Sequence, residues 1–155
     1  MVKLTQSMGD YLEAIYVEGL EKKVVRVKDI AKFLNVKTSS VVDAVGKLTD
    51  RGLVIHERYG YLELTKKGTG VAKSIYKKHK ELYKFFYEVL GISPEVSARD
   101  ACKFEHYISK ETLDRIVKFI TFIETCPEGY PVWLESFNYY AKHGKRPETC
   151  PKEKA

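Results

Sequence analysis

Residues 27–51 read VKDIAKFLNVKTSSVVDAVGKLTDR, and this stretch decides the fold. Apolar residues recur every three or four positions on both sides of a polar break at residues 35–37, which predicts two short helices joined by a tight turn. The hydroxyl side chains of residues 38–40 are expected to cap the second helix, which should run from Ser39 to Arg51 before Gly52 ends it. The stretch therefore predicts a helix-turn-helix.

The flanking sequence extends this motif into a winged helix-turn-helix. Before it, apolar residues at helical spacing predict a first helix from Ser7 to Leu20. After it, Leu53–Arg58 and Tyr61–Thr65 are rich in β-prone residues and are separated by Tyr59-Gly60, a pattern that is typical of a hairpin. Three helices followed by a hairpin are the elements of a winged helix-turn-helix.

The rest of the chain is predicted to be helical. A long segment from Lys66 to Leu90 is followed by two segments over 97–108 and 110–124, the second capped by Ser109, and by a last one over 132–143. The sequence therefore predicts a mainly α protein, in which a winged helix-turn-helix domain precedes an all-helical domain with a bundle or dimer interface.

Size and composition exclude several classes of protein. With 155 residues, of which 44% are hydrophobic, the chain is long enough for one domain with a compact appendage and too short for a large multidomain enzyme. No apolar run resembles a signal peptide or a membrane span, so we expect a cytoplasmic protein without a membrane partner. Three cysteines, an odd number, argue against a disulfide framework and leave metal binding, redox chemistry or simple burial.

Positive charge is concentrated on the predicted helix-turn-helix. The chain has a net charge of +6, and eight basic residues against three acidic ones fall between Lys22 and Arg51. A basic helix of this kind fits the major groove of duplex DNA, with residues near its start at base edges and flanking cations at phosphates. The candidates for DNA contact are Arg26, Lys37, Thr38, Ser39, Ser40, Asp43, Lys47 and Arg58.

Each of these residues also has an interpretation without DNA. The hydroxyl residues can be simple helix caps, and the lysines can form a solvated face. Asp43 on the proposed reading face would repel phosphate, although it could accept a hydrogen bond from a cytosine amino group. The combination of motif and charge favours a double-stranded DNA operator as the partner.

A second set of residues has the chemistry of metal ligands. Cys102, Glu105 and His106 occupy positions i, i+3 and i+4, which a helix points toward one patch. A thiolate, a carboxylate and an imidazole together suit a divalent transition metal better than calcium or magnesium, whose preferred ligands are oxygens. Asp10 and Glu13 place two carboxylates on one face of the first predicted helix. Taken singly, these residues are also consistent with a buried thiol and surface carboxylates.

These motifs occur together in an order seen in a known family. The segments SMGDYLEAIY at 7–16, TSSVV at 38–42, Lys78-His79 and ACKFEH at 101–106 resemble the diphtheria-toxin-repressor family of iron- and manganese-dependent transcriptional repressors. The resemblance covers roughly residues 4–122. It implies a winged-helix DNA-binding domain, a helical dimerisation domain and repression that is activated by a bound metal(II) ion. Residues 126–155 are too few for an SH3-like third domain.

The positions that match the family's metal ligands imply a site that is a hybrid of the iron-type and manganese-type sites. Asp10 stands where iron-type repressors have Met and manganese-type ones have Asp, whereas Cys102 is an iron-type ligand that replaces a manganese-type carboxylate. The residues that the resemblance implies as metal ligands are Asp10, Glu13, His79, Cys102, Glu105 and His106. The implied domains are a DNA-binding domain over 1–72, a metal-binding and dimerisation domain over 73–125, and a C-terminal extension over 126–155 that packs on it.

The expected function is a metal(II)-activated, DNA-binding transcriptional regulator, a repressor in metal-ion homeostasis that acts as a homodimer. Coordination would tie the first helix to the helical domain and so fix the spacing of the two reading helices. The Cys102 thiolate favours iron(II) over manganese(II), while Asp10 and Glu13 favour harder ions, with zinc or cobalt as substitutes in vitro. The alternatives are a regulator that responds to oxidation of Cys102 and a metal-dependent enzyme, for which we find neither a phosphate loop nor a nucleophile motif.

The last 30 residues carry two further patterns. Cys126 and Cys150, each followed by Pro, could form a redox pair, bind a second metal or simply pack. Four aromatic residues are expected to form a stripe that docks the last helix on the bundle: Trp133, Phe137, Tyr139 and Tyr140.

Overall fold

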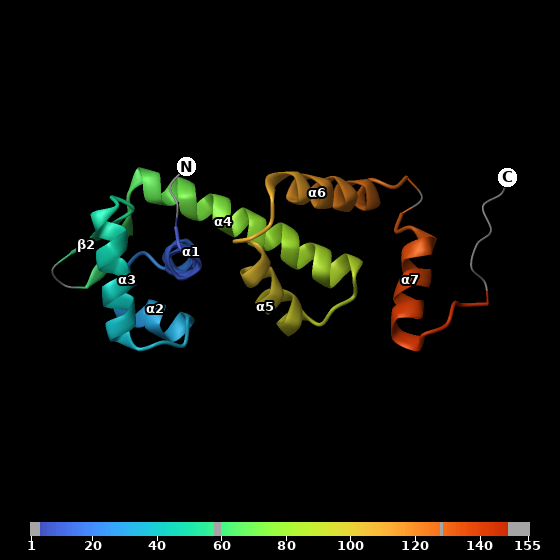
Figure 1. Ribbon diagram of the computed structural model, residues 1–155, viewed down its shortest axis with the longest axis horizontal. Coiled ribbons are helices and arrows are strands. Elements are labelled where there is room, and N and C mark those ends of the chain that lie inside the picture. Colours follow the sequence, from blue (N-terminus) through green and yellow to red (C-terminus); the bar gives the residue numbers. More distant parts are fainter. Residues whose placement is uncertain (1–3, 58–59, 128, 149–155) are drawn as a thin grey trace. The chain divides into compact units, whose positions relative to one another are not determined.

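The computed structural model describes residues 4–57, 60–127 and 129–148, which form helices and one small sheet (Figure 1). The helices are α1 (Gln6–Glu21), α2 (Val27–Phe33), α3 (Thr38–Asp50), α4 (Lys66–Lys84), the π-helix η1 (Phe85–Val89), α5 (Pro94–Phe104), α6 (Lys110–Glu124) and α7 (Val132–His143). The strands are β1 (Val25–Arg26), β2 (Val54–His56) and β3 (Tyr61–Leu64). The chain divides into two compact units, the first ending at Lys78 and the second beginning at His79. Within the described ranges, every helix is too short or too polar to span a lipid bilayer.

The core of the first unit forms where α1, α2 and α3 bring their apolar faces together. Leu12, Ile15, Ile30 and Leu48 are all at most 2% exposed. Burying one such side chain stabilises the folded state by about 1.5–3 kcal/mol, so the apolar spacing read from the sequence is sufficient to hold the three helices together. Tyr16 of α1 also contacts the ring of Tyr76 on α4, with 5.7 Å between the centroids.

The wing is a three-stranded antiparallel sheet with the order β1-β3-β2. Val25 of β1 pairs with Leu62, and Val54 of β2 pairs with Leu64. The hairpin is confirmed, but the sequence did not predict β1, because a two-residue strand is too short to show an alternating pattern. The turn between α2 and α3 contains Asn35 at a φ of 53°, a left-handed conformation that Asn tolerates better than most residues.

The start of α3 differs from the expectation. Lys37 is the N-cap residue, and no side chain makes a capping hydrogen bond there. Thr38, Ser39 and Ser40 lie inside the first turn and are exposed, so the prediction that they cap the helix was wrong. Their hydroxyl groups face solvent on the same part of the helix that was proposed to read DNA.

The start of α2 is held by Asp29. Its carboxylate accepts a hydrogen bond of 2.9 Å from the backbone N–H of Arg26 and lies 3.2 Å from the ammonium group of Lys22. Partial burial raises the pKa of Asp29, but the bonds from Arg26 and Lys22 outweigh it, so the pKa lies below its ordinary value. The charged form is therefore more stable in the folded protein than in the unfolded chain, and folding gains this stabilisation above the ordinary carboxyl pKa.

The variant Asp29→Ala is expected to lower the free energy of unfolding by about 1 kcal/mol at neutral pH, because an orphan N–H at a helix start loses its acceptor. The difference between variant and parent should shrink as the pH falls through the lowered pKa of Asp29. Urea unfolding at neutral pH and at about pH 3 measures both effects. A loss of stability that stays the same in acid would contradict an ionic contribution of Asp29.

The second unit begins in α4, which ends earlier than expected. The α-helix stops at Lys84 and continues as η1, where the N–H of Leu90 donates to the carbonyl of Phe85 at 3.1 Å. Gly91 follows at a φ of 65°, as a residue that ends a helix should. Lys84 forms an ion pair with Glu124 of α6, and this hydrogen bond raises the pKa of Lys84. The pair ties the end of α4 to α6.

Helices α6 and α7 have the bounds that the sequence predicts, and Ser109 caps α6 by accepting a hydrogen bond of 3.1 Å from the N–H of Thr112. Helix α5 starts at Pro94, earlier than expected, and ends at Phe104 rather than near residue 108. Together with Val89 of η1, three side chains of α6 and α7 form the core of the unit: Ile120, Ile123 and Leu134.

The aromatic residues of α7 are largely exposed. Leu134 is the buried residue of this helix and is 1% exposed, whereas Trp133, Phe137 and Tyr140 are 45%, 40% and 50% exposed. The prediction of a docking stripe was therefore wrong for the stripe as a whole, although Trp133 contacts the ring of Phe119 on α6, with 6.0 Å between the centroids. Tyr139 is also exposed, and its ring lies 4.4 Å from the imidazole of His143, centroid to centroid, in a tilted arrangement.

Candidate metal centre and nucleic-acid interface

The carboxylate of Glu105 lies at the centre of a cluster of metal-ligand residues in the second unit. Its side chain is wholly buried. Oε2 lies 3.0 Å from Nδ1 of His79 on α4, and Oε1 lies 3.3 Å from Nε2 of His106. The Sγ of Cys102 and a carboxylate oxygen of Glu105 lie within 4.8 Å of each other. The second unit thus brings together four of the six residues that the resemblance implies as ligands.

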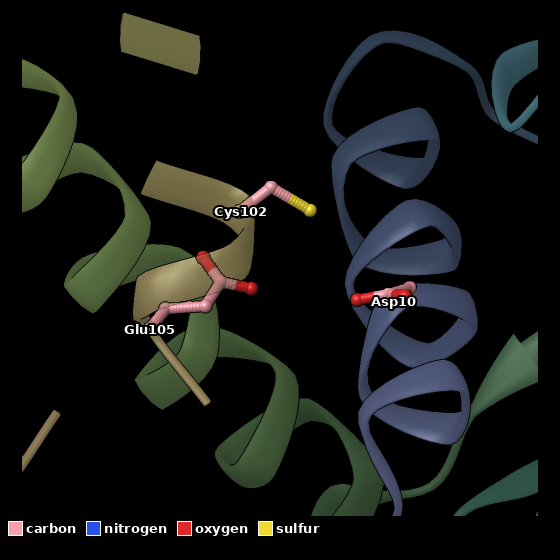
Figure 2. A group of neighbouring side chains, drawn as sticks. All are labelled: Asp10, Cys102 and Glu105. Atoms are coloured by element: carbon pink, nitrogen blue, oxygen red, sulfur yellow. The ribbon is translucent and has the colours of Figure 1, made fainter. Parts of the chain in front are cut away.

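The end of α5 positions three of these residues. The helix ends at Phe104, but Glu105 keeps helical backbone angles as the C-cap residue, and its N–H donates to the carbonyl of Ala101 at 3.0 Å. Cys102 and Glu105 therefore stay one turn apart on the same side, and both extend from α5 in Figure 2. His106 lies in the turn that follows rather than inside a helix, which corrects the expectation that all three share one helix.

The buried carboxylate fits a bound cation. Among the described residues, no group makes a hydrogen bond with Oε1 of Glu105, although this atom is buried. A buried charge without a full set of hydrogen bonds is costly, and a cation that binds Oε1 removes that cost. Imidazole nitrogens, a thiol and a carboxylate are the donor set of a divalent transition metal. The residues of this cluster therefore fit such an ion.

Two further candidate ligands lie on α1 in the first unit. Asp10 and Glu13 are one helical turn apart, so their carboxylates are on the same face of the helix. Asp10 is half-buried, and Glu13 is only 8% exposed. Figure 2 shows the side chain of Asp10 extending from α1. Charged side chains are seldom this buried unless they are paired, so the burial of Glu13 distinguishes it from an ordinary surface carboxylate.

Within the helix-turn-helix, α3 has one buried face and one exposed face. Val41, Val45 and Leu48 are fully buried and fix the rotation of the helix about its axis. All of the α3 candidates for DNA contact, together with the N-cap residue, consequently lie on the solvent face: Lys37, Thr38, Ser39, Ser40, Asp43 and Lys47.

The two arginine candidates have different outcomes. The Arg26 side chain is held against the wing, because its guanidinium lies 5.1 Å from the ring centroid of Tyr61 and donates to the hydroxyl of Tyr61 at 3.3 Å. Cation–π contact of this kind orients a guanidinium while leaving other N–H groups for a ligand. Arg58 lies outside the described residues.

A cleft between α1 and α3 adds two residues that sequence reasoning missed. It has a volume of about 470 Å³, and its lining includes Ser7, Lys47 and Arg51. Thr5 caps α1 at the mouth of this cleft by accepting a hydrogen bond of 3.3 Å from the N–H of Met8. Arg51 follows Lys47 by one helical turn, and that spacing was the signal in the sequence. Two cations and a helix start in one polar cleft form a favourable environment for a phosphate group.

Comparison with known proteins identifies both units. Residues 3–62 match the family described as iron dependent repressor, N-terminal DNA binding domain, and residues 65–134 match iron dependent repressor, metal binding and dimerisation domain. An uncharacterized HTH-type transcriptional regulator of Methanocaldococcus jannaschii is 39% identical over 118 residues, which cover 76% of this chain and 94% of that protein. The HTH-type transcriptional regulator MntR of Bacillus subtilis is 38% identical over 120 residues, covering 77% and 84%.

Solved structures agree with this assignment. The manganese regulator SloR superposes with a TM-score of 0.68 and 30% identity, covering 80% of this chain and 58% of SloR. IdeR of T. acidophilum gives a TM-score of 0.67 and 27% identity, covering 85% and 61%. The chain thus spans about three fifths of these two solved proteins.

The matched relatives are transcriptional regulators, which confirms the expectation that the chain is not an enzyme and removes the metal-dependent enzyme as an alternative. The winged helix-turn-helix followed by a helical domain, predicted from the sequence, is also confirmed. The chain belongs to the iron-dependent repressor family, that is, the diphtheria-toxin-repressor family of metal-dependent transcriptional repressors.

Proposed function

We propose that this protein is a metal(II)-activated repressor that binds operator DNA as a homodimer in the cytoplasm and controls metal-ion homeostasis. The observation that carries the proposal is the wholly buried Glu105 carboxylate, which has two imidazoles and a thiol around it and one oxygen without a hydrogen bond among the described residues. Structural ion pairs do not need a thiol or a second imidazole at the same carboxylate, whereas these donors together are typical ligands of a transition metal.

The ligands proposed for the metal come from both units. His79, Cys102, Glu105 and His106 supply nitrogen, sulfur and oxygen donors from the helical unit, and Asp10 and Glu13 supply carboxylates from α1. A bound divalent cation would supply positive charge that offsets these carboxylates and stabilises an arrangement in which α1 is fixed to the helical unit. The DNA-reading helix would then be held in one orientation, because α1 and α3 share the core of the first unit.

Iron(II) is the metal favoured by the donor set, because Cys102 offers a thiolate, a softer ligand than manganese(II) prefers. Manganese(II) is the second candidate. It is favoured by the carboxylates of Asp10 and Glu13 and by the solved relative described as a manganese regulator. Zinc and cobalt would bind the same donors in vitro, since intrinsic affinity for such ligands rises along the first transition series.

The proposed DNA interface is the exposed face of α3 with its neighbours. Thr38, Ser39, Ser40 and Asp43 would meet base edges, because they lie on the solvent face near the helix start. The cations would contact phosphates, which strengthens binding without discriminating between sequences. These cations are Arg26, Lys37, Lys47 and Arg58, with Arg51 added from the cleft between α1 and α3.

The proposed dimer interface is an apolar groove in the helical unit. The groove has a volume of about 530 Å³, and its lining includes Phe86, Phe104, Tyr107 and Ile116. Phe104 and Tyr107 are 54% and 78% exposed, so two large aromatic side chains face solvent beside this groove. A second copy of the chain would cover them, and a two-fold dimer would present two reading helices to successive major grooves about 34 Å apart.

Sequence proximity connects this groove to the proposed metal site. Phe104 and Tyr107 immediately flank Glu105 and His106 in a turn where the N–H of Tyr107 donates to the carbonyl of Phe104 at 3.0 Å. A change in the positions of the two ligands therefore moves the two aromatic side chains as well. Metal binding and dimer geometry would be coupled through this turn.

The proposal is tested by a DNA-binding titration. A duplex selected from a random pool in the presence of metal would be titrated with protein, with iron(II) or manganese(II) under anaerobic, reducing conditions, and with a chelator. We expect metal to tighten binding by about 5–150-fold, the usual range of allosteric coupling. Equal affinity with metal and with chelator would refute metal activation.

Two further arms separate the alternatives. The variant Cys102→Glu should lower the ratio of the iron(II) response to the manganese(II) response, because a hard oxygen replaces the thiolate. Mild oxidation of metal-free protein tests a thiol-responsive regulator, for which the half-buried Cys102 would supply the thiol. If DNA affinity followed oxidation and ignored chelation, that second function would replace metal activation.

A further inference from the structure

The outward face of α7 is not used by the proposed DNA-binding and metal-binding sites. Trp133, Phe137 and Tyr140 follow one another at positions i, i+4 and i+7, so their rings lie on one face of the helix, and all three are exposed whereas Leu134 is buried. The family match ends at residue 134, and most of α7 and the segment after it lie beyond that match. Phe137 and Tyr140 therefore lie beyond the matched part of the chain, and Trp133 lies next to its end.

The segment after α7 turns this face into a pocket. Gly144 ends the helix at a φ of 69°, and its N–H donates to the carbonyl of Tyr140 at 2.8 Å. The left-handed residue reverses the chain direction, so that residues 146 and 147 return toward the aromatic face. The result is a cavity of about 450 Å³ next to α7, within the usual size range of small-molecule sites. It is lined by Trp133, Ser136, Phe137, Tyr140, Arg146 and Pro147.

The lining combines flat apolar walls with one permanent cation. The Trp133 indole is supported from α6 by the ring of Phe119, with 6.0 Å between the centroids. Ser136 donates its hydroxyl proton to the carbonyl of Val132 at 3.2 Å, so it has no proton left to donate to a ligand. The guanidinium of Arg146 is the cationic donor of the pocket, and its planar fork matches a carboxylate.

We propose that this pocket binds a small aromatic carboxylate, with its ring against the aromatic side chains of α7 and its carboxylate on Arg146. Ring stacking accounts for the three aromatic walls, and charge complementarity selects an acid over a neutral ring. The proposal depends on neither metal nor DNA, so it stands or fails separately from the proposed function.

Trp133 makes the test direct, because it is the only tryptophan in the chain. The full chain would be titrated with 4-bromobenzoate, whose bromine quenches indole fluorescence, and with 4-bromobenzyl alcohol, which has the same ring without the carboxylate. We expect saturable quenching by the acid with a Kd on the order of 1 mM, as befits a ligand of this size. The alcohol should bind about tenfold more weakly or worse.

Two variants show whether Arg146 is responsible for the preference for the acid over the alcohol. Arg146→Met should weaken binding of the acid by about tenfold and leave binding of the alcohol unchanged, because the substitution removes the charge and keeps an unbranched side chain. Lys142→Met, a change of one nearby exposed cation outside the lining, is the matched control and should bind the acid as the parent does. Linear quenching without saturation, equal affinity for acid and alcohol, or unchanged affinity in Arg146→Met would each overturn the proposal. So would light scattering that shows a second copy shielding Trp133 from both probes.

Discussion

The variant Glu105→Gln is expected to bind the selected operator with the same affinity in the presence and absence of metal(II). Glutamine keeps the size and shape of the side chain but removes the charge that would bind the cation most strongly. The tightening expected for the parent, about 5–150-fold, should therefore disappear. The metal-free stability should change by no more than about 1 kcal/mol, because the amide oxygen can take the place of Oε2 beside His79, and the amide nitrogen replaces Oε1, which makes no hydrogen bond among the described residues.

Anaerobic DNA titrations and urea unfolding of the metal-free protein measure these two quantities. The matched control is Glu111→Gln on α6, which changes an exposed carboxylate in the same unit and should keep the full metal response. If metal still tightened DNA binding by the Glu105→Gln variant, the buried carboxylate would be structural, and the main support for the proposed function would be removed. A variant that failed to fold would show the same thing by the unfolding measurement.

The variant Gly68→Ala is expected to lower the free energy of unfolding of the first unit by about 3 kcal/mol, at the upper end of the usual cost of overpacking. A Cβ atom at this position would lie 1.9 Å from the carbonyl oxygen of Leu53, which is backbone and cannot swing away. That carbonyl also accepts a hydrogen bond of 3.0 Å from the N–H of Thr65. Relief of the clash would therefore move the chain where β2, β3 and α4 join.

Urea or thermal unfolding, followed by circular dichroism, measures the loss. Gly70→Ala is the matched control, because this glycine lies in the same helix and has no atom within 4 Å of an added Cβ. It should stabilise the protein by about 0.5–1 kcal/mol through the better helix propensity of alanine. If both variants were equally stable, the close approach of α4 to Leu53 would not exist in solution.

Apolar spacing predicted the helices well and their ends less well. The bounds of α6 and α7 follow from a cap at Ser109 and from a left-handed Gly144, both local signals. The N-terminus of α3 was misassigned because hydroxyl residues are good caps in general, and no local rule shows whether the chain enters the helix one residue earlier. The strand β1 was missed because its only evidence is its partner, Leu62, on β3.

The candidate metal site was predicted residue by residue, but the reason for its chemistry was not. Spacing and family resemblance indicated Glu105 and His79, yet nothing in the sequence showed that the carboxylate is wholly buried or that His79 lies 3.0 Å from it. Ser7 and Arg51 were missed for a related reason, since a cleft between two helices has no signature within either of them.

The sequence by itself determined the number, order and apolar faces of the helices and the choice of candidate metal ligands, because helical periodicity and donor chemistry can be read from the residues alone. Only the tertiary structure decided the exposure of those residues. Leu134 rather than three aromatic side chains buries α7 in the bundle, and a glycine at position 144 turns the chain back over the exposed rings. Burial depends on which face another segment covers, and that is set by contacts between residues far apart in the chain.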